Sequence, residues 1–320
     1  MRQIHSNPAG LRARRFFLPL LILLAAGAAG AAEHSEAAPL AAKSLLLAVT
    51  RAGDKLVAVG DRGHVLVSAD QGRTWAQSPA PTRALLTGVS FVDANHGWAV
   101  GHDGVIMATS DAGMTWTRQD SGQDLETVYL DVYFRDLSHG MAIGAYGKFV
   151  LTADGGKTWT AAKPAEDEVH YNRITAGTDG YLYLAGEGGL LLISRDGGKD
   201  WTKAELPYNG SLFGALPLDN GRVVVYGLRG HILRSEDHGA AWSEENSTVP
   251  VLIMGGTRLA SGPVVLAGQG GNFSVSRDGG RTFTHWKPAD FGTSIAGVID
   301  AGDGALLTVG EAGAVRVALP

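Results

Sequence analysis

Six aspartates recur along the chain in the same local setting, and carboxylates repeated in this way could bind calcium or catalyse hydrolysis. Each follows a serine or threonine by two residues and precedes a glycine by two and an aromatic residue by five; we call this unit the Asp-box. The aspartates are Asp70, Asp111, Asp154, Asp196, Asp237 and Asp278, and the aromatic residues are Trp75, Trp116, Trp159, Trp201, Trp242 and Phe283.

Equivalent carboxylates on successive repeats lie apart and cannot converge on one ligand. We therefore interpret the Asp-box as structural. Its aspartate accepts N–H hydrogen bonds within its own turn, and its glycine permits a left-handed backbone. The aromatic residue is large enough to fill the gap between neighbouring repeats.

The other residue types that carry chemistry give little support for a metal or covalent site. Cysteine is absent, and none of the ten histidines stands in a His-x-x-x-His or His-Glu-x-x-His spacing. His64 and His231 occupy one matched repeat position, and His96 and His139 occupy another, which indicates turn or packing roles. We expect no metal, no cofactor and no catalytic residue.

A second marker precedes each Asp-box and defines the elements that position it. A Gly-x-x-Gly turn occurs at residues 60–63, 101–104, 144–147, 186–189, 227–230, 268–271 and 310–313. Seven turns stand against six boxes, because the last repeat ends where its box would begin. Each repeat of about forty residues contains four short strand patterns, A to D, which predicts one propeller blade. The second repeat has them at 87–92, 97–100, 105–109 and 115–118.

The predicted fold is an all-β, seven-bladed propeller of four-stranded blades over residues 33–320. The last repeat lacks its fourth strand, so we expect residues 36–43 to supply that strand and close the ring. Closure matters because an open blade leaves an unpaired strand edge.

The first 32 residues are predicted to be a signal peptide. Arg12, Arg14 and Arg15 precede an apolar run at 16–24, and small residues precede a cleavage site after Ala32. We expect export to the periplasm by the secretory route, with the twin-arginine route as the alternative. A net charge of −5 gives no basic field for nucleic acid, and no later apolar run is long enough to span a membrane.

Topology predicts where a partner would bind. In a four-stranded meander the B–C and D–A loops share one face, and the A–B loops share the other face with the Asp-boxes. The first face carries more varied side chains, and loops on a rigid scaffold commonly bind ligands. The candidate partner-binding residues are Arg62, His102, Asp103, Tyr146, His170, Asn172, Arg173, Glu187, Tyr208 and Arg229.

The second and third repeats, with the strings at 91–101, 131–144 and 152–159, resemble the photosystem II stability/assembly factor family. That resemblance covers the mature chain and implies a seven-bladed propeller. It also implies a role in assembling a membrane complex, or in accompanying a transporter of the resistance-nodulation-division type. We accordingly predict a non-catalytic, monomeric periplasmic scaffold with a protein partner in an inner-membrane or periplasmic complex.

The alternative is a glycoside hydrolase, or a propeller that binds carbohydrate, since Asp-boxes also occur in sialidases and endoglucanases. A sialidase needs three convergent arginines and a Phe/Tyr-Arg-Ile-Pro motif, to which residues 172–175 are the nearest string. Sialidases have six blades, and seven turns are present here. Another glycosidase would need two carboxylates about 5–10 Å apart. Asp61, Asp103, Glu187 and Glu311 are expected on one face.

Overall fold

The structure is a computed structural model that describes residues 34–245 and 249–319. The predicted signal peptide, residues 1–32, lies outside the described residues and stays a prediction. None of the helices in the described ranges is long and apolar enough to cross a membrane.

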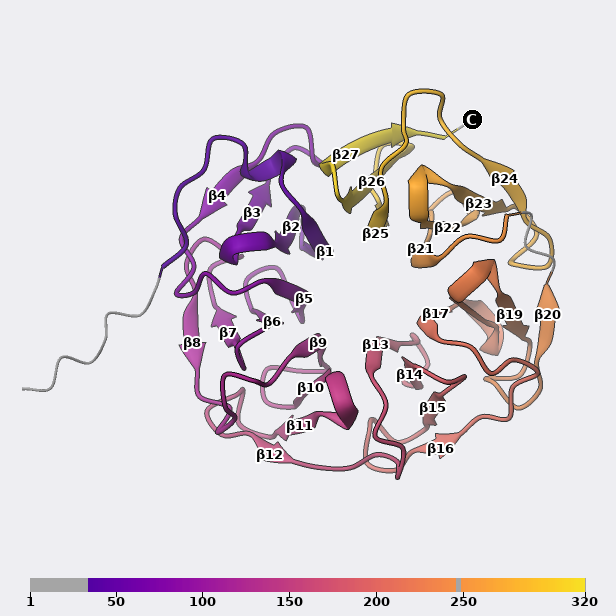
Figure 1. Ribbon diagram of the computed structural model, residues 1–320, viewed down its shortest axis with the longest axis horizontal. Helices are drawn as coiled ribbons and strands as arrows, with labels where there is room; N and C mark the ends of the chain where they lie inside the picture. The colour runs from indigo at the N-terminus through magenta and orange to yellow at the C-terminus, as the bar shows by residue number, and fades with distance from the viewer. Residues whose placement is uncertain (1–33, 246–248, 320) are drawn as a thin grey trace, which may run out of the picture. The chain divides into compact units, whose positions relative to one another are not determined.

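Seven antiparallel sheets form a ring, which confirms the predicted seven-bladed β-propeller (Figure 1). Blade 1 contains β1 (Leu46–Ala52), β2 (Lys55–Gly60), β3 (Val65–Ser68) and β4 (Ala76–Ser78). Blade 2 contains β5 (Leu86–Phe91), β6 (Gly97–Gly101), β7 (Ile106–Thr109) and β8 (Thr117–Gln119). Blade 3 contains β9 (Tyr129–Phe134), β10 (Gly140–Gly144), β11 (Phe149–Thr152) and β12 (Thr160–Ala161). Blade 4 contains β13 (Tyr171–Ala176), β14 (Leu182–Gly186), β15 (Leu191–Ser194) and β16 (Thr202–Lys203).

The remaining three blades follow the same plan, except that the last has three strands. Blade 5 contains β17 (Leu212–Pro217), β18 (Val223–Gly227), β19 (Ile232–Ser235) and β20 (Ser243–Glu245). Blade 6 contains β21 (Ile253–Arg258), β22 (Val264–Gly268), β23 (Phe273–Ser276) and β24 (Thr284–Trp286). Blade 7 contains β25 (Ile295–Asp300), β26 (Ala305–Gly310) and β27 (Gly313–Ala318). Short 3-10 helices are η1 (Ala41–Lys43), η2 (Asp61–Gly63), η3 (Ala145–Gly147), η4 (Asp219–Gly221), η5 (Leu228–Gly230) and η6 (Gln269–Gly271).

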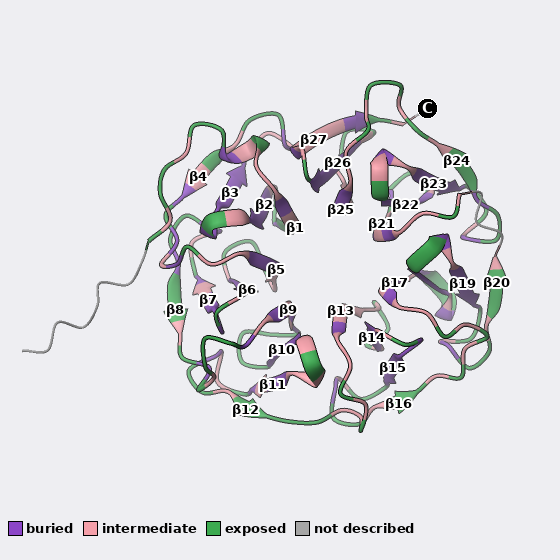
Figure 2. Ribbon diagram, in the orientation of Figure 1, coloured by how far each residue is buried: buried purple, intermediate pink, exposed green. Residues whose placement is uncertain are grey.

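The first strand of each blade lines the centre of the ring, and in the four-stranded blades the last strand lies at the rim (Figure 1). In the four-stranded blades the second and third strands are almost wholly buried, because both of their faces pack against neighbouring blades, whereas the fourth strands are largely exposed (Figure 2). Their sequences follow from this position. β18 is Val-Val-Val-Tyr-Gly, a continuous apolar run, and β20 is Ser-Glu-Glu.

Each Asp-box aromatic packs against the blade that precedes its own. Trp116 of blade 2 lies in one apolar cluster with Val57 and Val67 of blade 1. Trp201 of blade 4 meets Phe149 of blade 3 edge to face, with ring centroids 6.2 Å apart. The predicted role of these residues in filling the gaps between blades is confirmed.

The Asp-box carboxylate is saturated by its own turn. In blade 3, Asp154 Oδ1 accepts the Thr152 hydroxyl at 2.9 Å and the Thr158 N–H at 2.9 Å, and Oδ2 accepts the Thr158 hydroxyl at 2.7 Å. Thr152 Oγ1 in turn accepts the Gly156 N–H at 2.8 Å. In all six boxes the aspartate accepts the preceding Ser or Thr hydroxyl and the N–H four residues later. These contacts agree with the structural interpretation.

The ring closes differently from the prediction. Residues 36–43 form no strand, and the described part of blade 7 has three strands. The Ser35 and Ala38 N–H groups donate to Ala80 O and Gln77 Oε1 beside the outer strand of blade 1, and residues 41–43 then turn as η1. The segment that was predicted to pair with β27 therefore bonds to blade 1 and turns instead.

The amino-terminal segment nevertheless joins blades 7 and 1. Ala41 is buried with Leu46 of blade 1 and Val309 of blade 7. A methyl group on Gly313 would lie 2.1 Å from Ala42 O, so this turn fits against the segment only as glycine. Asp303 adds ion pairs from blade 7 to Arg73 of blade 1, at 2.5 Å, and to Arg316 of its own blade, at 2.6 Å.

We predict that acid destabilises the protein through the Asp-boxes. Hydrogen bonds, the Thr158 hydroxyl first among them, lower the pKa of Asp154 from 3.8 to about 2. A carboxyl group whose pKa is lower in the folded than in the unfolded protein stabilises the fold at pH values above its unfolded pKa. This stabilisation is lost as the pH falls through the folded pKa. The melting temperature should therefore fall steeply between about pH 4 and pH 2. Asp154→Ala should melt lower at pH 7 and show a shallower acid decline; a parallel decline would contradict this account.

Removal of the amino-terminal segment should open the ring. A chain that begins at Ser44 loses the buried Ala41 and exposes Leu46 and Val309, and we expect a loss of about 2–4 kcal/mol in the free energy of unfolding. Denaturant titration measures it. A chain that begins at Ser35 is the control, because it keeps every described contact of this segment. Equal stability of the two chains would show that the segment does not close the ring.

Candidate functional site

The Gly-x-x-Gly turns and the D–A loops lie on one face, as predicted. The second glycine of these turns approaches the loop that leads to the next blade, as where Gly104 N–H donates to Thr127 O at 2.8 Å and Gly147 N–H donates to Val169 O at 2.8 Å. The Asp-boxes bond instead to A–B loops, as in Gly155 N–H to Ser138 O at 2.9 Å. We name these the Gly-x-x-Gly face and the Asp-box face.

Four Gly-x-x-Gly turns hold a large side chain in a left-handed backbone conformation. The third turn residue has φ of 52° at Arg62, 57° at Asp103, 54° at Tyr146 and 57° at Arg229. Blades 4 and 6 have glycine at the same position. A non-glycine residue in this region costs about 1–2 kcal/mol. These four side chains project into solvent, and Tyr146 is 80% exposed. Strain held at exposed side chains marks a candidate functional surface.

Two aromatic–histidine–glutamate groups extend across this face. The Tyr146 ring meets the His170 ring edge to face at 4.7 Å, and His170 Nδ1 lies 3.5 Å from Glu187 Oε1 of the next blade. On the other side of blade 4, Tyr208 stacks on His231 at 4.0 Å, and His231 Nδ1 lies 2.5 Å from Glu244 Oε1. Desolvation raises the pKa of the Tyr208 hydroxyl.

The structure brings eight of the ten predicted residues to the Gly-x-x-Gly face, and two lie elsewhere. Asn172 and Arg173 are in β13, the inner strand of blade 4, and not in a D–A loop. The strand starts at Tyr171 and includes both residues, which line the central channel. Asn172 Nδ2 donates to Leu212 O of blade 5 at 2.8 Å. Partner binding by any of the ten stays a prediction. The eight are Arg62, His102, Asp103, Tyr146, His170, Glu187, Tyr208 and Arg229.

The central channel contains charged groups that sequence reasoning missed. Every inner strand has a register shift between its first and third residues. The third residue of the inner strand is glycine or alanine in five blades, whereas it is Asp131 in blade 3 and Arg173 in blade 4. Gly88 makes room for this carboxylate, since a methyl group there would lie 2.9 Å from Asp131 Oδ1. Alignment of the seven repeats at this position would have identified the two exceptions.

Asp131 joins blade 3 to blade 4. Its Oδ2 accepts the Ile174 N–H at 3.1 Å. Burial raises the pKa of Asp131, and the positive charge of Arg173 opposes this shift. The central channel contains a cavity with a volume of about 360 Å³, and Asp131 is the only carboxylate among the described residues that line it. The described lining of this cavity thus has one carboxylate, whereas a glycosidase uses two.

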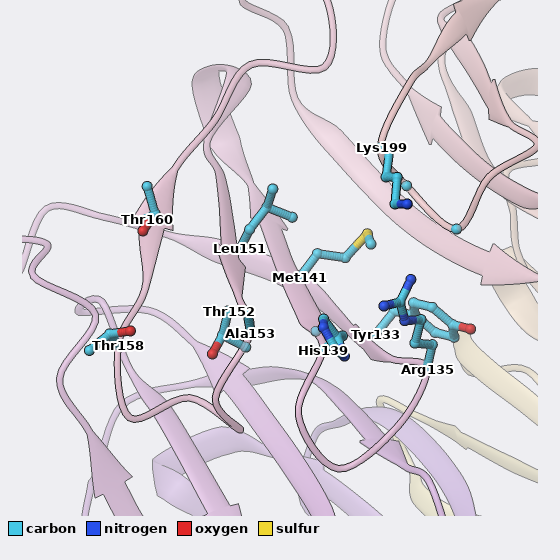
Figure 3. Close-up of a pocket in the computed structure, with 13 residues that line it drawn as sticks. Tyr133, Arg135, His139, Met141, Leu151, Thr152, Ala153, Thr158, Thr160 and Lys199 are labelled. Atoms are coloured by element: carbon cyan, nitrogen blue, oxygen red, sulfur yellow. The ribbon is translucent and has the colours of Figure 1, made fainter.

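A second cavity, the blade 3–4 pocket, opens on the Asp-box face and has a volume of about 390 Å³ (Figure 3). Tyr133, Met141 and Leu151 of blade 3 form its apolar wall, and Arg135 and Lys199 carry positive charge at its edge. Nothing in the repeat pattern distinguished this interface. No group of three or more potential metal-ligating side chains occurs within residues 34–245 and 249–319.

Comparison with known proteins identifies the family. The family model for the photosynthesis system II assembly factor YCF48 matches residues 119–296, more than half of the chain. The chain belongs to the YCF48 family. Among curated proteins, no significant match was found.

Solved structures share the fold with this YCF48-family chain. "YCF48 bound to D1 peptide" is 19% identical, with a TM-score of 0.71 over 87% of this chain and 93% of the other. YCF48 from Cyanidioschyzon merolae is 18% identical, with a TM-score of 0.69 over 86% and 96% of the two chains. A streptogramin B lyase is 16% identical, with a TM-score of 0.75 over 90% and 97%. Propellers of this shape thus include enzymes, whereas the family is one of assembly factors and supports a binding scaffold.

Reciprocal substitutions test the strain on the Gly-x-x-Gly face. Gly188→Ala places a side chain at φ +64° with open space around it, and we expect a loss of about 1 kcal/mol in unfolding free energy from backbone strain alone. Arg229→Gly relieves the same strain, offset by the entropy of an unfolded glycine, and should not destabilise the protein. Chemical denaturation measures both changes. A destabilised Arg229→Gly protein would show that Arg229 is retained for the fold and not for the surface.

Proposed function

We propose that this YCF48-family chain is a non-catalytic scaffold that is exported to the periplasm and binds a protein partner at the inner membrane. Binding uses the Gly-x-x-Gly face. The observation that carries the proposal is the row of exposed Arg62, Tyr146 and Arg229 side chains at left-handed turn positions where blades 4 and 6 use glycine. Since stability alone favours glycine there, these side chains are retained for contact with a partner.

The chemistry of this face fits an extended protein segment. Tyrosine and arginine are the residue types that most often dominate binding energy at protein interfaces. Tyr146 meets His170 edge to face and Tyr208 stacks on His231, and both histidines lie beside glutamates, so the face alternates aromatic surface with charge. A relative of known structure is described as bound to a D1 peptide, which supports peptide recognition as the mode of binding here. Export rests on the pattern of residues 1–32.

Two of the four carboxylates expected on this face, Glu187 and Glu311, are committed to its loops. Glu187 Oε2 accepts the His170 N–H at 3.3 Å, and Glu311 Oε2 accepts the Ser294 N–H at 2.9 Å. A general acid or nucleophile needs a carboxyl group that is free to meet the substrate. This use of Glu187 and Glu311 favours the scaffold over the hydrolase.

Co-purification from the cell envelope tests the proposal. Cross-linked wild-type protein should retain an inner-membrane protein, and the Tyr146→Gly/Arg229→Gly protein should retain much less while it melts at the same temperature. Met114→Ala/Lys157→Ala, on the Asp-box face, is the matched control and should retain as much as wild type. Equal capture by the Tyr146/Arg229 protein, or loss in the control, would refute this choice of face.

A further inference from the structure

The blade 3–4 pocket arises from side-chain differences between two neighbouring blade interfaces. Between blades 2 and 3, Trp98 stacks on Phe134 at 3.5 Å, and its indole N–H donates to Gly155 O at 3.3 Å. Met141 and Ala176 occupy the equivalent positions between blades 3 and 4. Leu182 stands where blade 3 has Gly140, and Met141, with Tyr133 and Leu151, lines a hollow at this interface in place of the stacked rings.

Positive charge is concentrated at the edge of this hollow. Figure 3 shows the Arg135 guanidinium and the Lys199 side chain near Met141, from opposite sides of the blade boundary. Blade 2 has Val92 where blade 3 has Arg135. Arg135 reaches the next blade: a methyl group on Gly197 would be 3.0 Å from a terminal nitrogen of its guanidinium group.

Several hydrogen-bond donors here are not used by the fold. Arg135 uses Nε for Asp136, at 3.2 Å, and its two terminal nitrogens have no hydrogen bond among the described residues. Lys199 Nζ likewise has no hydrogen bond or ion pair within the described chain. The Tyr133 hydroxyl borders the same space, and burial raises its pKa, so it remains protonated and able to donate. His139 Nδ1 lies 3.0 Å from Asp136 Oδ1, so only Nε2 of this ring is left for another partner.

We propose that the blade 3–4 pocket binds an organic anion that has an apolar body. The apolar part lies against Met141, Leu151 and Tyr133, and the acidic group lies between Arg135 and Lys199. A volume of about 390 Å³ is in the lower part of the range for small-molecule sites, which suits a ligand about the size of an aryl acid. Arginine and lysine from two blades provide charge-assisted hydrogen bonds to a carboxylate.

This site lies on the Asp-box face and is independent of the proposed partner surface. The Tyr146→Gly/Arg229→Gly protein should therefore bind the anion as wild type does. Loss of the partner surface and loss of the anion site can thus be observed separately.

Calorimetric titration with 4-phenylbutyrate, 4-phenylbutanol, 4-phenylbutylammonium and inorganic phosphate tests the proposal. The carboxylate should bind saturably, and the alcohol and the ammonium compound at least about tenfold more weakly, because they lack the charge-assisted hydrogen bonds. Phosphate alone should bind weakly, because it cannot use the apolar wall. No saturable binding of 4-phenylbutyrate, or equal affinity for the alcohol, would overturn the proposal.

Lys199→Gln and Arg135→Gln should each weaken the binding of 4-phenylbutyrate by about tenfold and leave the melting temperature unchanged. Lys157→Gln is the matched control, because Lys157 has the same Asp-box position at the interface that Trp98 and Phe134 fill. It should bind as wild type does. Equal effects of the Lys199 and Lys157 substitutions would show that general surface charge, and not the pocket, attracts the anion.

Discussion

The hydrogen bonds that each Asp-box carboxylate accepts within its own turn are the interaction on which the ring depends. They fix the turn between the third and fourth strands, and this turn places the aromatic residue against the preceding blade. Asp154 with Thr152 and Thr158 shows the full arrangement. Blades contact only their neighbours, so a repeated local lock of this kind maintains the whole ring. Where blade 7 has no box, Asp303 and the amino-terminal segment replace it.

The Asp-boxes fix the fold from one face of the ring, so residues on the other face can vary. The glycines of the Gly-x-x-Gly turns are required by close backbone approach, since a methyl group on Gly101 would lie 2.1 Å from Leu85 O. The two residues between them face no such constraint, and four blades accept left-handed strain to present a large side chain there. The Asp-box face has its own exception in the blade 3–4 pocket, which Met141 lines at the position where Trp98 stacks on Phe134 one interface earlier.

Sequence reasoning predicted the features that repeat and missed those that do not. The blade number, the paired faces and the structural role of Asp70 and its equivalents all follow from recurrence at a steady interval. The closing segment was predicted as a strand because an incomplete sheet needs a partner, yet its N–H groups bond to Gln77 and Ala80 and the segment turns. Asp131 and the pocket depend on single departures from the repeat, whose consequences require the packing of two blades to be known.

The central claim is that the Gly-x-x-Gly face binds the partner while the Asp-box face does not. Site-specific photo-cross-linking in intact cells tests it most directly, with a photoreactive residue placed in turn at Tyr146, Arg229, Met114 and Lys157. All four positions are exposed, so access to the probe does not bias the comparison. The account predicts adducts with one inner-membrane protein from Tyr146 and Arg229 and none from Met114 or Lys157. Adducts with that protein from Met114 or Lys157 alone would contradict it.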